Sequence, residues 1–184
     1  MDNRIIIGIT GATGIQYGLK ALELLKETPL ETHLVMSRSA EVVIKKEMLV
    51  NRERILSLAD VVYDIDDIGA AIASGSFRTV GMLVAPCTVK TMAEIASGIA
   101  GSLLTRAADV VLKERRRLVV MVRETPLHLG HLRNMVAITE MGGIVMPPVP
   151  SFYTHPRSID DMVTHSVGRA LDLFGIITDI PRWK

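Results

Sequence analysis

Residues 4–18 read RIIIGITGATGIQYG and set the pattern for the rest of the chain. The apolar run at 4–9 has the length of a strand that is buried on both faces, as in a parallel sheet covered by helices. The turn TGATG at 10–14 follows, and helical spacing begins at Ile15. A buried strand, a glycine turn and a helix in this order are typical of the first unit of a parallel α/β sheet.

The same alternation continues along the chain. Apolar runs of strand length recur at 32–36, 80–85, 118–122 and 144–146, and stretches with helical spacing lie at 15–27, 40–47, 89–97, 103–116, 129–141 and 158–174. Strands and helices in alternation predict a doubly wound parallel sheet in a three-layer α/β sandwich. Residues 51–77 are the least regular part, and Ser74-Gly75-Ser76 within them is expected to be a loop.

The bulk properties limit the classes of protein that the chain can represent. Its 184 residues fit a single domain, 1–184, and its net charge of +1 argues against a broad surface for nucleic acid or anionic membrane. The lone Cys87 cannot form an internal disulfide, and no apolar run approaches the ~20 residues that span a bilayer. We therefore expect a cytoplasmic protein that meets any anionic ligand with local cations.

The first turn is a candidate phosphate site, because glycines let the backbone approach an anion and the helix start offers unpaired N–H groups. A tight turn without a ligand is the alternative. A dinucleotide-binding dehydrogenase is less favoured, because the glycines stand at 11, 14 and 18 and not in G-x-G-x-x-G spacing. The second strand also ends without an acidic residue for a ribose, although Arg38 could meet a 2′-phosphate. Ser37 is either a ligand hydroxyl or the cap of the next helix.

The third strand runs into the loop APCTVKT at 85–91. Its hydroxyls and backbone amides stand at a helix start, where they suit a phosphate. Cys87 is a weak candidate for a nucleophile, because no His or Asp partner is evident and a single buried cysteine is common in protein cores.

Charged residues flank the fourth strand. Lys113 lies seven residues after Arg106, so the two share one helix face, although the basic run beyond them could be a solvated helix end. Arg123 and Glu124 emerge from the apolar strand, where burial without partners would be costly. We expect this pair to face a polar cleft, and a structural ion pair is the alternative.

Three further features come later in the chain. His128 and His131 stand three apart, but no third ligand has a convincing spacing, so we expect helix-start residues and no metal. Prolines in PPVPSFY at 147–153 fix the direction of Tyr153, either against a ligand or into aromatic packing. Arg169, on the last helix, could extend along the surface or clamp a phosphate.

Taken together, these segments resemble the flavin prenyltransferase (UbiX-like) family. The matching stretches, in order, are GATG at 11–14, PCT at 86–88, RAAD at 106–109, KER at 113–115, RE-x-P at 123–126 and P-x-P-x-FY at 148–153. They cover nearly the whole chain, so the resemblance is more specific than any single motif. Two positions depart from the family pattern: Thr13 replaces a common serine, and Lys90 adds a cation to its loop.

The resemblance implies a flavodoxin-like (Rossmann-like) flavoprotein that assembles from trimers into a homo-oligomer, with a dodecamer as one such assembly. It implies a metal-independent transfer of a dimethylallyl group from dimethylallyl phosphate to reduced FMN, with release of phosphate. The prenylated FMN would serve a separate aromatic acid decarboxylase as cofactor.

By motif match, the resemblance also assigns residues to three roles. FMN would be held by Gly11, Ala12, Thr13, Ser37, Thr88, Val89, Lys90, Thr91 and Arg123. Dimethylallyl phosphate would be held by Tyr153 and Arg169, and the reactive pocket would be completed by Glu47, Arg106, Lys113 and Glu124. Cations in this set would stabilise the departing phosphate, and Glu124 would donate a proton to it.

Two other functions stay open at this point. One is an FMN-dependent decarboxylase of peptidyl or phosphopantothenoyl cysteine with the same fold, although its characteristic early His and Asn-bearing loop have no clear counterpart here. The other is a non-catalytic flavin carrier that supports a decarboxylase.

Overall fold

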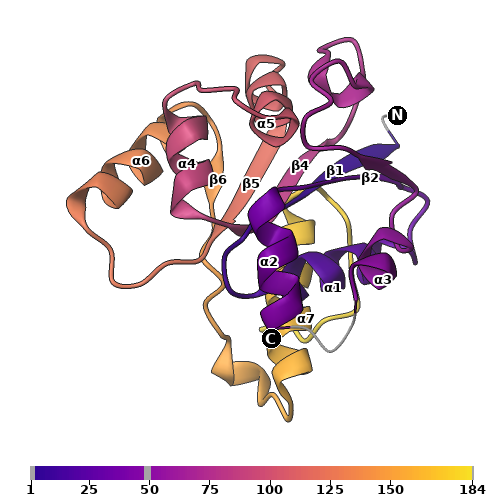
Figure 1. Cartoon of the computed structure of the whole chain (residues 1–184). Coiled ribbons are helices and arrows are strands. Elements are labelled where there is room, and N and C mark those ends of the chain that lie inside the picture. The colour runs from indigo at the N-terminus through magenta and orange to yellow at the C-terminus, as the bar shows by residue number, and fades with distance from the viewer. Residues whose placement is uncertain (1–2, 48–50, 184) are drawn as a thin grey trace.

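Six parallel strands form one sheet in the order β3-β2-β1-β4-β5-β6 (Figure 1). The computed structural model describes residues 3–47 and 51–183. The strands are β1 (Arg4–Ile9), β2 (Glu31–Met36), β3 (Val61–Tyr63), β4 (Gly81–Cys87), β5 (Arg117–Val122) and β6 (Ile144–Val145). The helices are α1 (Ile15–Leu25), α2 (Arg38–Glu47), α3 (Arg52–Leu56), α4 (Val89–Ala96), α5 (Leu103–Lys113), α6 (Leu129–Glu140) and α7 (Ile159–Asp172), with 3-10 turns η1 (Ala71–Ala73) and η2 (Phe152–Thr154).

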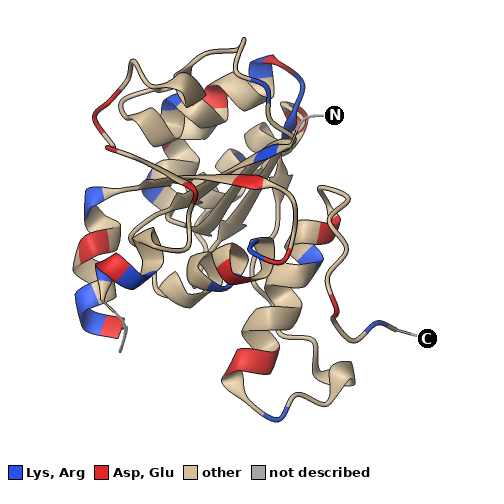
Figure 2. Ribbon diagram, turned by 90° about the vertical axis from the view of Figure 1, so that its right-hand side faces the viewer, with Lys and Arg blue, Asp and Glu red and all other residues tan. Residues whose placement is uncertain are grey.

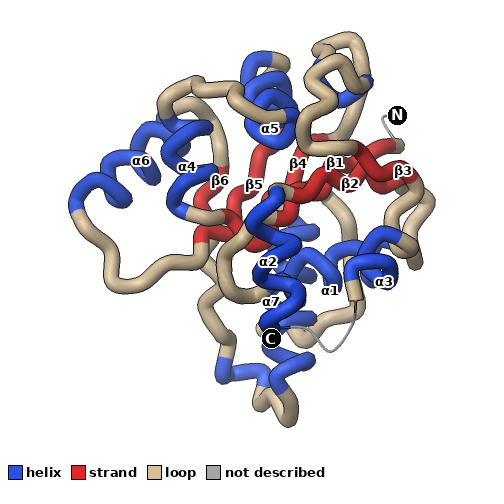
Figure 3. Tube along the Cα trace, viewed as in Figure 1, coloured by secondary structure: helices blue, strands red, loops and turns tan. Residues whose placement is uncertain are grey.

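Each face of the sheet is covered by helices (Figure 3). Ile5, Ile7 and Ile9 of β1 belong to a core cluster with residues of α1, α2, α3 and α7. Ile6 points to the other face and belongs to a second cluster with residues of α4, α5 and α6. Because β1 is buried on both sides, its apolar run needs no polar alternation. The predicted doubly wound, three-layer α/β fold is confirmed.

The strand order determines where along the sheet a ligand can bind. α1 follows β1 onto one face of the sheet, whereas α4 follows β4 onto the other, so the loops that leave these two neighbouring strands diverge. In open parallel sheets, ligands bind at the carboxyl ends of the strands where such a divergence occurs. The turn at 10–14 and the loop at 87–91 therefore flank the expected binding position.

Three short elements lie in the segment that we expected to be irregular, namely α3, the edge strand β3 and the 3-10 turn η1. Asp60 helps to join β3 to β2, because its Oδ2 accepts hydrogen bonds from the backbone N and from Oγ1 of Thr32, both at 2.8 Å. The bond from the Thr32 amide is the main cause that lowers the pKa of the Asp60 carboxyl. Residues 74–76 lie in a loop, as predicted.

Some boundaries differ from the prediction. The helix expected at 103–116 ends at Lys113, and Arg115 just beyond it has a left-handed backbone with φ of 56°. The residues after α7 turn back along that helix, where a methyl group on Gly168 would lie 2.6 Å from Oγ1 of Thr178. Figure 2 shows basic and acidic residues interspersed along the ribbon, as the small net charge suggests. In the described ranges, no helix has the length and apolarity needed to cross a membrane.

Candidate functional site

The loops after β1, β2, β4 and β5 are tied together by hydrogen bonds. The amide of Ser37 donates to the carbonyl of Ile9 at 2.9 Å, and the amide of Arg123 donates to the carbonyl of Cys87 at 3.1 Å. Between them, Oγ1 of Thr10 donates to the carbonyl of Pro86 and accepts from the amide of Thr88, both at 2.8 Å. These bonds hold the four loops together at the edge of the sheet where the carboxyl ends of the parallel strands lie.

The glycine turn is tight against the start of α2. A methyl group on Gly11 would lie 2.5 Å from the side chain of Ser39, so only glycine fits that position. Gly14 caps α1 with φ of 102°, which favours glycine, and its amide donates to Oε2 of Glu47 at 2.9 Å. Glu47 therefore reaches the turn from the end of α2, beside the exposed Thr13.

Ser37 acts as the cap of α2. Its Oγ accepts from the amide of Ala40 at 3.2 Å and lies 3.0 Å from Oγ of Ser39. Of the two roles that the sequence left open for Ser37, the structure shows the helix cap. A serine hydroxyl has further hydrogen-bonding capacity, so this role leaves ligand contact open.

The start of α4 is a second helix terminus at the same edge. Thr88 caps it, accepting from the amide of Thr91 at 3.1 Å and donating to its hydroxyl at 3.0 Å. Lys90 turns its ammonium to Glu94, one turn along, at 3.2 Å and is largely exposed. A contact of Lys90 with a ligand in this loop would therefore come from its backbone amide. The first amides of a helix, here those of Val89 and Lys90, have no partner within the helix.

Arg123 and Glu124 are both exposed at this edge. Oε1 of Glu124 accepts from the amide of Thr125 at 3.0 Å. Tyr17 of α1 lies within the electrostatic reach of Arg123: burial raises the pKa of this phenol, and the guanidinium partly opposes the shift.

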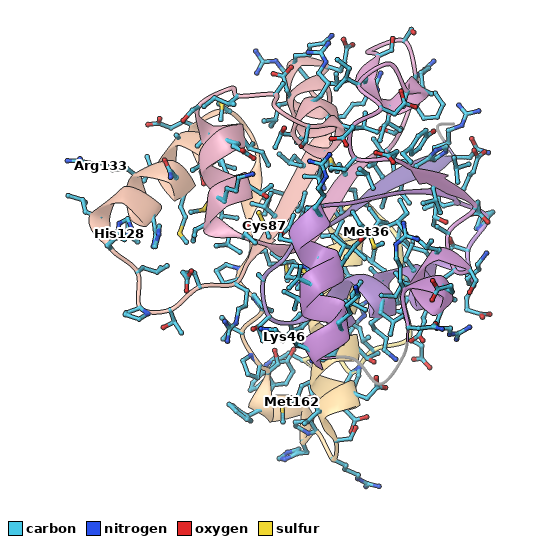
Figure 4. All side chains as sticks on the ribbon, in the orientation of Figure 1. Met36, Lys46, Cys87, His128, Arg133 and Met162 are labelled. Atoms are coloured by element: carbon cyan, nitrogen blue, oxygen red, sulfur yellow. The ribbon has the colours of Figure 1, made fainter. Side chains whose placement is uncertain are left out.

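Cys87 and the two histidines have structural roles. Burial raises the pKa of the Cys87 thiol to about 12, so the thiolate that a nucleophile needs is not populated at neutral pH. His128 caps α6, with its Nδ1 accepting from the amide of Gly130 at 3.0 Å, and its ring stacks on His131 with centroids 3.6 Å apart. Figure 4 shows Cys87 in the interior and His128 at the outer end of α6.

Tyr153 and Arg169 belong to a second group, which we call the C-terminal cluster: Tyr153, His165, Arg169, Asp172, Arg182 and Trp183. Oη of Tyr153 lies 3.4 Å from Nε2 of the buried His165, one helical turn before Arg169. The ring of Trp183 packs edge-on against Tyr153, with centroids 5.1 Å apart.

Asp172 is the centre of charge in this cluster. It accepts from Arg169 at 2.6 Å and from Arg182 at 2.8 and 2.9 Å. The bonds from Arg182, together with the bond from Arg169, hold the pKa of the Asp172 carboxyl below its ordinary value, although burial acts in the opposite direction. The carboxylate is therefore ionised at neutral pH and orders both guanidinium groups.

Arg106 and Lys113 do not join either group within one chain. Arg106 pairs with Asp109 at 2.7 Å and donates to the carbonyl of Ala73, while Lys113 pairs with Glu114. α5 ends just before β5 begins, so Lys113 lies at the amino edge of the sheet. Arg123 stands at the other end of β5, about 20 Å away at 3.3 Å per residue. The expectation that Lys113 completes the pocket is not met inside a single subunit.

Sequence reasoning missed the roles of Asp172, Arg182 and His165. The three-residue spacing between Arg169 and Asp172 is a recognisable helix ion pair. The approach of Arg182 depends on the path of the tail after α7, for which the sequence has no local signal.

Comparison with known proteins identifies one family, one close relative in sequence and two similar solved structures. A family model described as Flavoprotein matches residues 1–171. The flavin prenyltransferase UbiX of Neisseria meningitidis serogroup B is 59% identical over 185 residues, covering 100% of this chain and 98% of that protein. The crystal structure of AnUbiX (PadA1) in complex with FMN and dimethylallyl pyrophosphate is 50% identical with a TM-score of 0.98, covering 100% and 98% of the two chains. A dodecameric FMN-dependent UbiX-like decarboxylase from Escherichia coli O157:H7 is 48% identical with a TM-score of 0.96, covering 98% and 99%.

Proposed function

The chain belongs to the flavin prenyltransferase family of flavoproteins, and from this membership we propose its reaction, its substrates and the residues that serve them. The enzyme is a prenyltransferase that joins a dimethylallyl group from dimethylallyl phosphate to reduced FMN, releasing phosphate and giving prenylated FMN. The observation that carries the proposal is the 59% identity with a flavin prenyltransferase over the whole chain. The family motifs at 11–14, 86–88 and 123–126 stand on loops that meet at one edge of the sheet, which supports the same conclusion.

We place the FMN phosphate at the start of α4. The start of α1 already holds the carboxylate of Glu47 on the amide of Gly14, and a second anion there would be repelled. The start of α4 offers amides of Val89 and Lys90, and Arg123 is joined to the preceding strand. FMN would then extend from Thr88–Thr91 toward Ser37 and the turn formed by Gly11, Ala12 and Thr13.

The residues assigned to the prenyl phosphate fit its chemistry. Reduced FMN, when bound, supplies the nucleophile. As the bond between the allylic carbon and the phosphate oxygen breaks, negative charge grows on the phosphate, where Arg123, Arg169 and Lys113 would stabilise it. Tyr153 can donate a hydrogen bond to the same oxygens. The exposed Glu124 would hold the proton that the leaving phosphate takes up.

Arg106 and Lys113 require a second subunit in this proposal. Lys113 lies at the amino edge of the sheet, which separates it from Arg123 by the length of β5, and Arg106 is held on the same helix by Asp109 and the carbonyl of Ala73. A homo-oligomer built from trimers would bring the α5 face of one subunit to the strand-end loops of another. The dodecameric assembly of a relative that is 48% identical over nearly the whole chain supports such an arrangement.

An apolar surface on α6 suits that contact. Leu129, Leu132 and Val136 share one face of the helix and are 59%, 45% and 56% exposed, with Leu127 and Met141 at its two ends. α6 begins directly after the loop that carries Arg123, so a neighbour that covers this face also borders the site. A second copy of the chain is the occupant that we propose, because a contiguous apolar face beside a shared site is best explained by self-assembly.

The product is proposed to serve a separate aromatic acid decarboxylase in the cytoplasm. Prenylated FMN is a modified cofactor, and a cofactor acts only when it is bound to an enzyme that uses its chemistry, so a separate enzyme must use it. Turnover in the absence of that decarboxylase would distinguish an enzyme from a non-catalytic flavin carrier.

The decisive experiment is anaerobic incubation of the purified chain with reduced FMN and dimethylallyl phosphate, followed by mass spectrometry of the released flavin. We expect a flavin heavier by one prenyl unit together with free phosphate, without any added decarboxylase. An unchanged flavin, under conditions in which a known prenyltransferase works, would refute the proposed reaction. A parallel incubation with oxidised FMN and a peptide ending in cysteine tests the decarboxylase alternative, for which we expect no product.

A further inference from the structure

One carboxylate, that of Asp172, binds two arginine side chains at the end of α7. Its Oδ2 accepts from Nη1 of Arg169 at 2.6 Å and from Nη1 of Arg182 at 2.8 Å, and its Oδ1 accepts from Nη2 of Arg182 at 2.9 Å. The Asp172 side chain is 15% exposed, whereas those of Arg169 and Arg182 are 49% and 44% exposed. The carboxylate therefore lies beneath two guanidinium groups that face outward.

The tail that carries Arg182 is anchored along α7. Ile180 is 6% exposed and packs close to Gly168, where an added methyl group would lie 2.7 Å from it. Beyond it, the ring of Trp183 packs against Tyr153. These contacts on both sides of Arg182 hold its side chain at the helix end, so its ion pair is an ordered part of the cluster.

The two arginines bind the carboxylate in different ways. Arg182 makes a bidentate contact that uses both oxygens, and Arg169 makes a single bond to the oxygen that is shared. A guanidinium has five N–H donors in a rigid plane, so Arg169 keeps most of its donors for another anion. Without Arg182, Oδ1 of Asp172 would be free, and Arg169 could take the bidentate geometry that this pair of groups favours.

We propose that Arg182 is a positioning residue for the prenyl phosphate: by occupying both oxygens of Asp172, it restricts Arg169 to one bond and leaves the rest of its guanidinium directed to the phosphate. The inference rests on the proposed function, in which Arg169 binds dimethylallyl phosphate. Arg182 acts through Asp172 and does not itself contact the substrate.

The first test is Arg182→Ala in the full-length protein. We expect the KM for dimethylallyl phosphate to rise about tenfold, which corresponds to one lost charge-assisted hydrogen bond, with kcat and FMN affinity changed by less than about twofold. Arg52→Ala is the matched control, because Arg52 is similarly exposed and forms an ion pair with Glu41. A fall in FMN affinity and thermal stability together with kcat would mean a merely structural role and would overturn the proposal.

The second test separates positioning from direct contact. If Arg182 acts through Asp172, then Arg182→Ala added to Asp172→Asn should change the KM by less than about twofold, because the two effects are not additive. An equal rise of the KM in both backgrounds would show that Arg182 contacts the phosphate itself. Arg182→Lys should also raise the KM, since a lysine cannot occupy both oxygens, and full recovery by lysine would refute the bidentate argument.

A third variant, Arg169→Ala, distinguishes failure of this inference from failure of the function on which it rests. It should raise the KM at least as much as Arg182→Ala. An unchanged KM in Arg169→Ala would remove Arg169 from the phosphate site, and with it this inference. Product formation by the unmodified chain would still support prenyl transfer in that case.

Discussion

Gly11→Ala should damage the first turn, because the added methyl group has no space. It would lie 2.5 Å from Cβ and Oγ of Ser39 and 2.7 Å from the Ser39 backbone carbon. Carbon atoms in contact stand ~3.5–4.0 Å apart, so the turn and the start of α2 must separate by on the order of 1 Å. A backbone atom cannot rotate away as a side chain can. Overpacking of this kind costs about 1–3 kcal/mol.

The expected loss is measurable in two ways. At this chain length, about 1–3 kcal/mol lowers Tm by roughly 3–10 °C in a thermal melt. The same displacement moves the turn away from Ser37, so we also expect FMN affinity, measured by fluorescence titration, to fall about tenfold, equivalent to about 1.4 kcal/mol. Gly101→Ala is the control, because nothing lies within 4 Å of the methyl group that it adds. If both variants melt and bind FMN alike, the close approach at Gly11 does not constrain the site.

Three further predictions concern other parts of the molecule. Lys113→Ala and Arg123→Ala should each be inactive. If the two residues come from different subunits, assemblies formed from equal amounts of both variants should regain activity at about a quarter of their sites. No recovery of activity would place both residues in one chain. Asp60→Asn should lower Tm more at pH 7 than at pH 3. A carboxyl whose folded pKa is depressed stabilises the fold above its unfolded pKa of 3.8 and loses that effect as pH falls through the folded pKa. An equal loss of Tm at both pH values would contradict this. Leu132→Glu should reduce the size of the assembly in light scattering, whereas Arg133→Ala on the same helix should not, and an unchanged assembly in Leu132→Glu would exclude that face from the interface.

Most of the fold could be predicted because its signals are local. The runs that form β1, β4 and β5 are apolar on both faces, and a parallel sheet between two helical layers is the structure that buries them. β3 was missed because three residues carry no periodicity, and its place depends on the contact of Asp60 with Thr32, 28 residues away in the chain. The end of α5 was placed too late because the left-handed backbone of Arg115 is not signalled by its residue type.

The candidate site was only partly predictable. The loops at the strand ends could be grouped from the rule for parallel sheets, and the hydrogen bonds of Thr10 with residues 86 and 88 confirm that grouping. Spacing correctly placed Arg106 and Lys113 on one helix, but it did not show that this helix ends at the opposite edge of the sheet from Arg123. The assignment of individual residues to FMN and to prenyl phosphate stays a prediction.

By itself, the sequence determined the layers, the first turn and the family, because burial pattern, backbone freedom and ordered motifs are properties of short segments. Only the tertiary structure decided which distant groups meet: Glu47 with Gly14, Thr10 with Thr88, and Arg182 with the Asp172 that also holds Arg169. Such pairs depend on how the chain crosses between layers and how its tail returns along α7. The packing of the whole chain sets those paths, and no single segment of the sequence carries a signal for them.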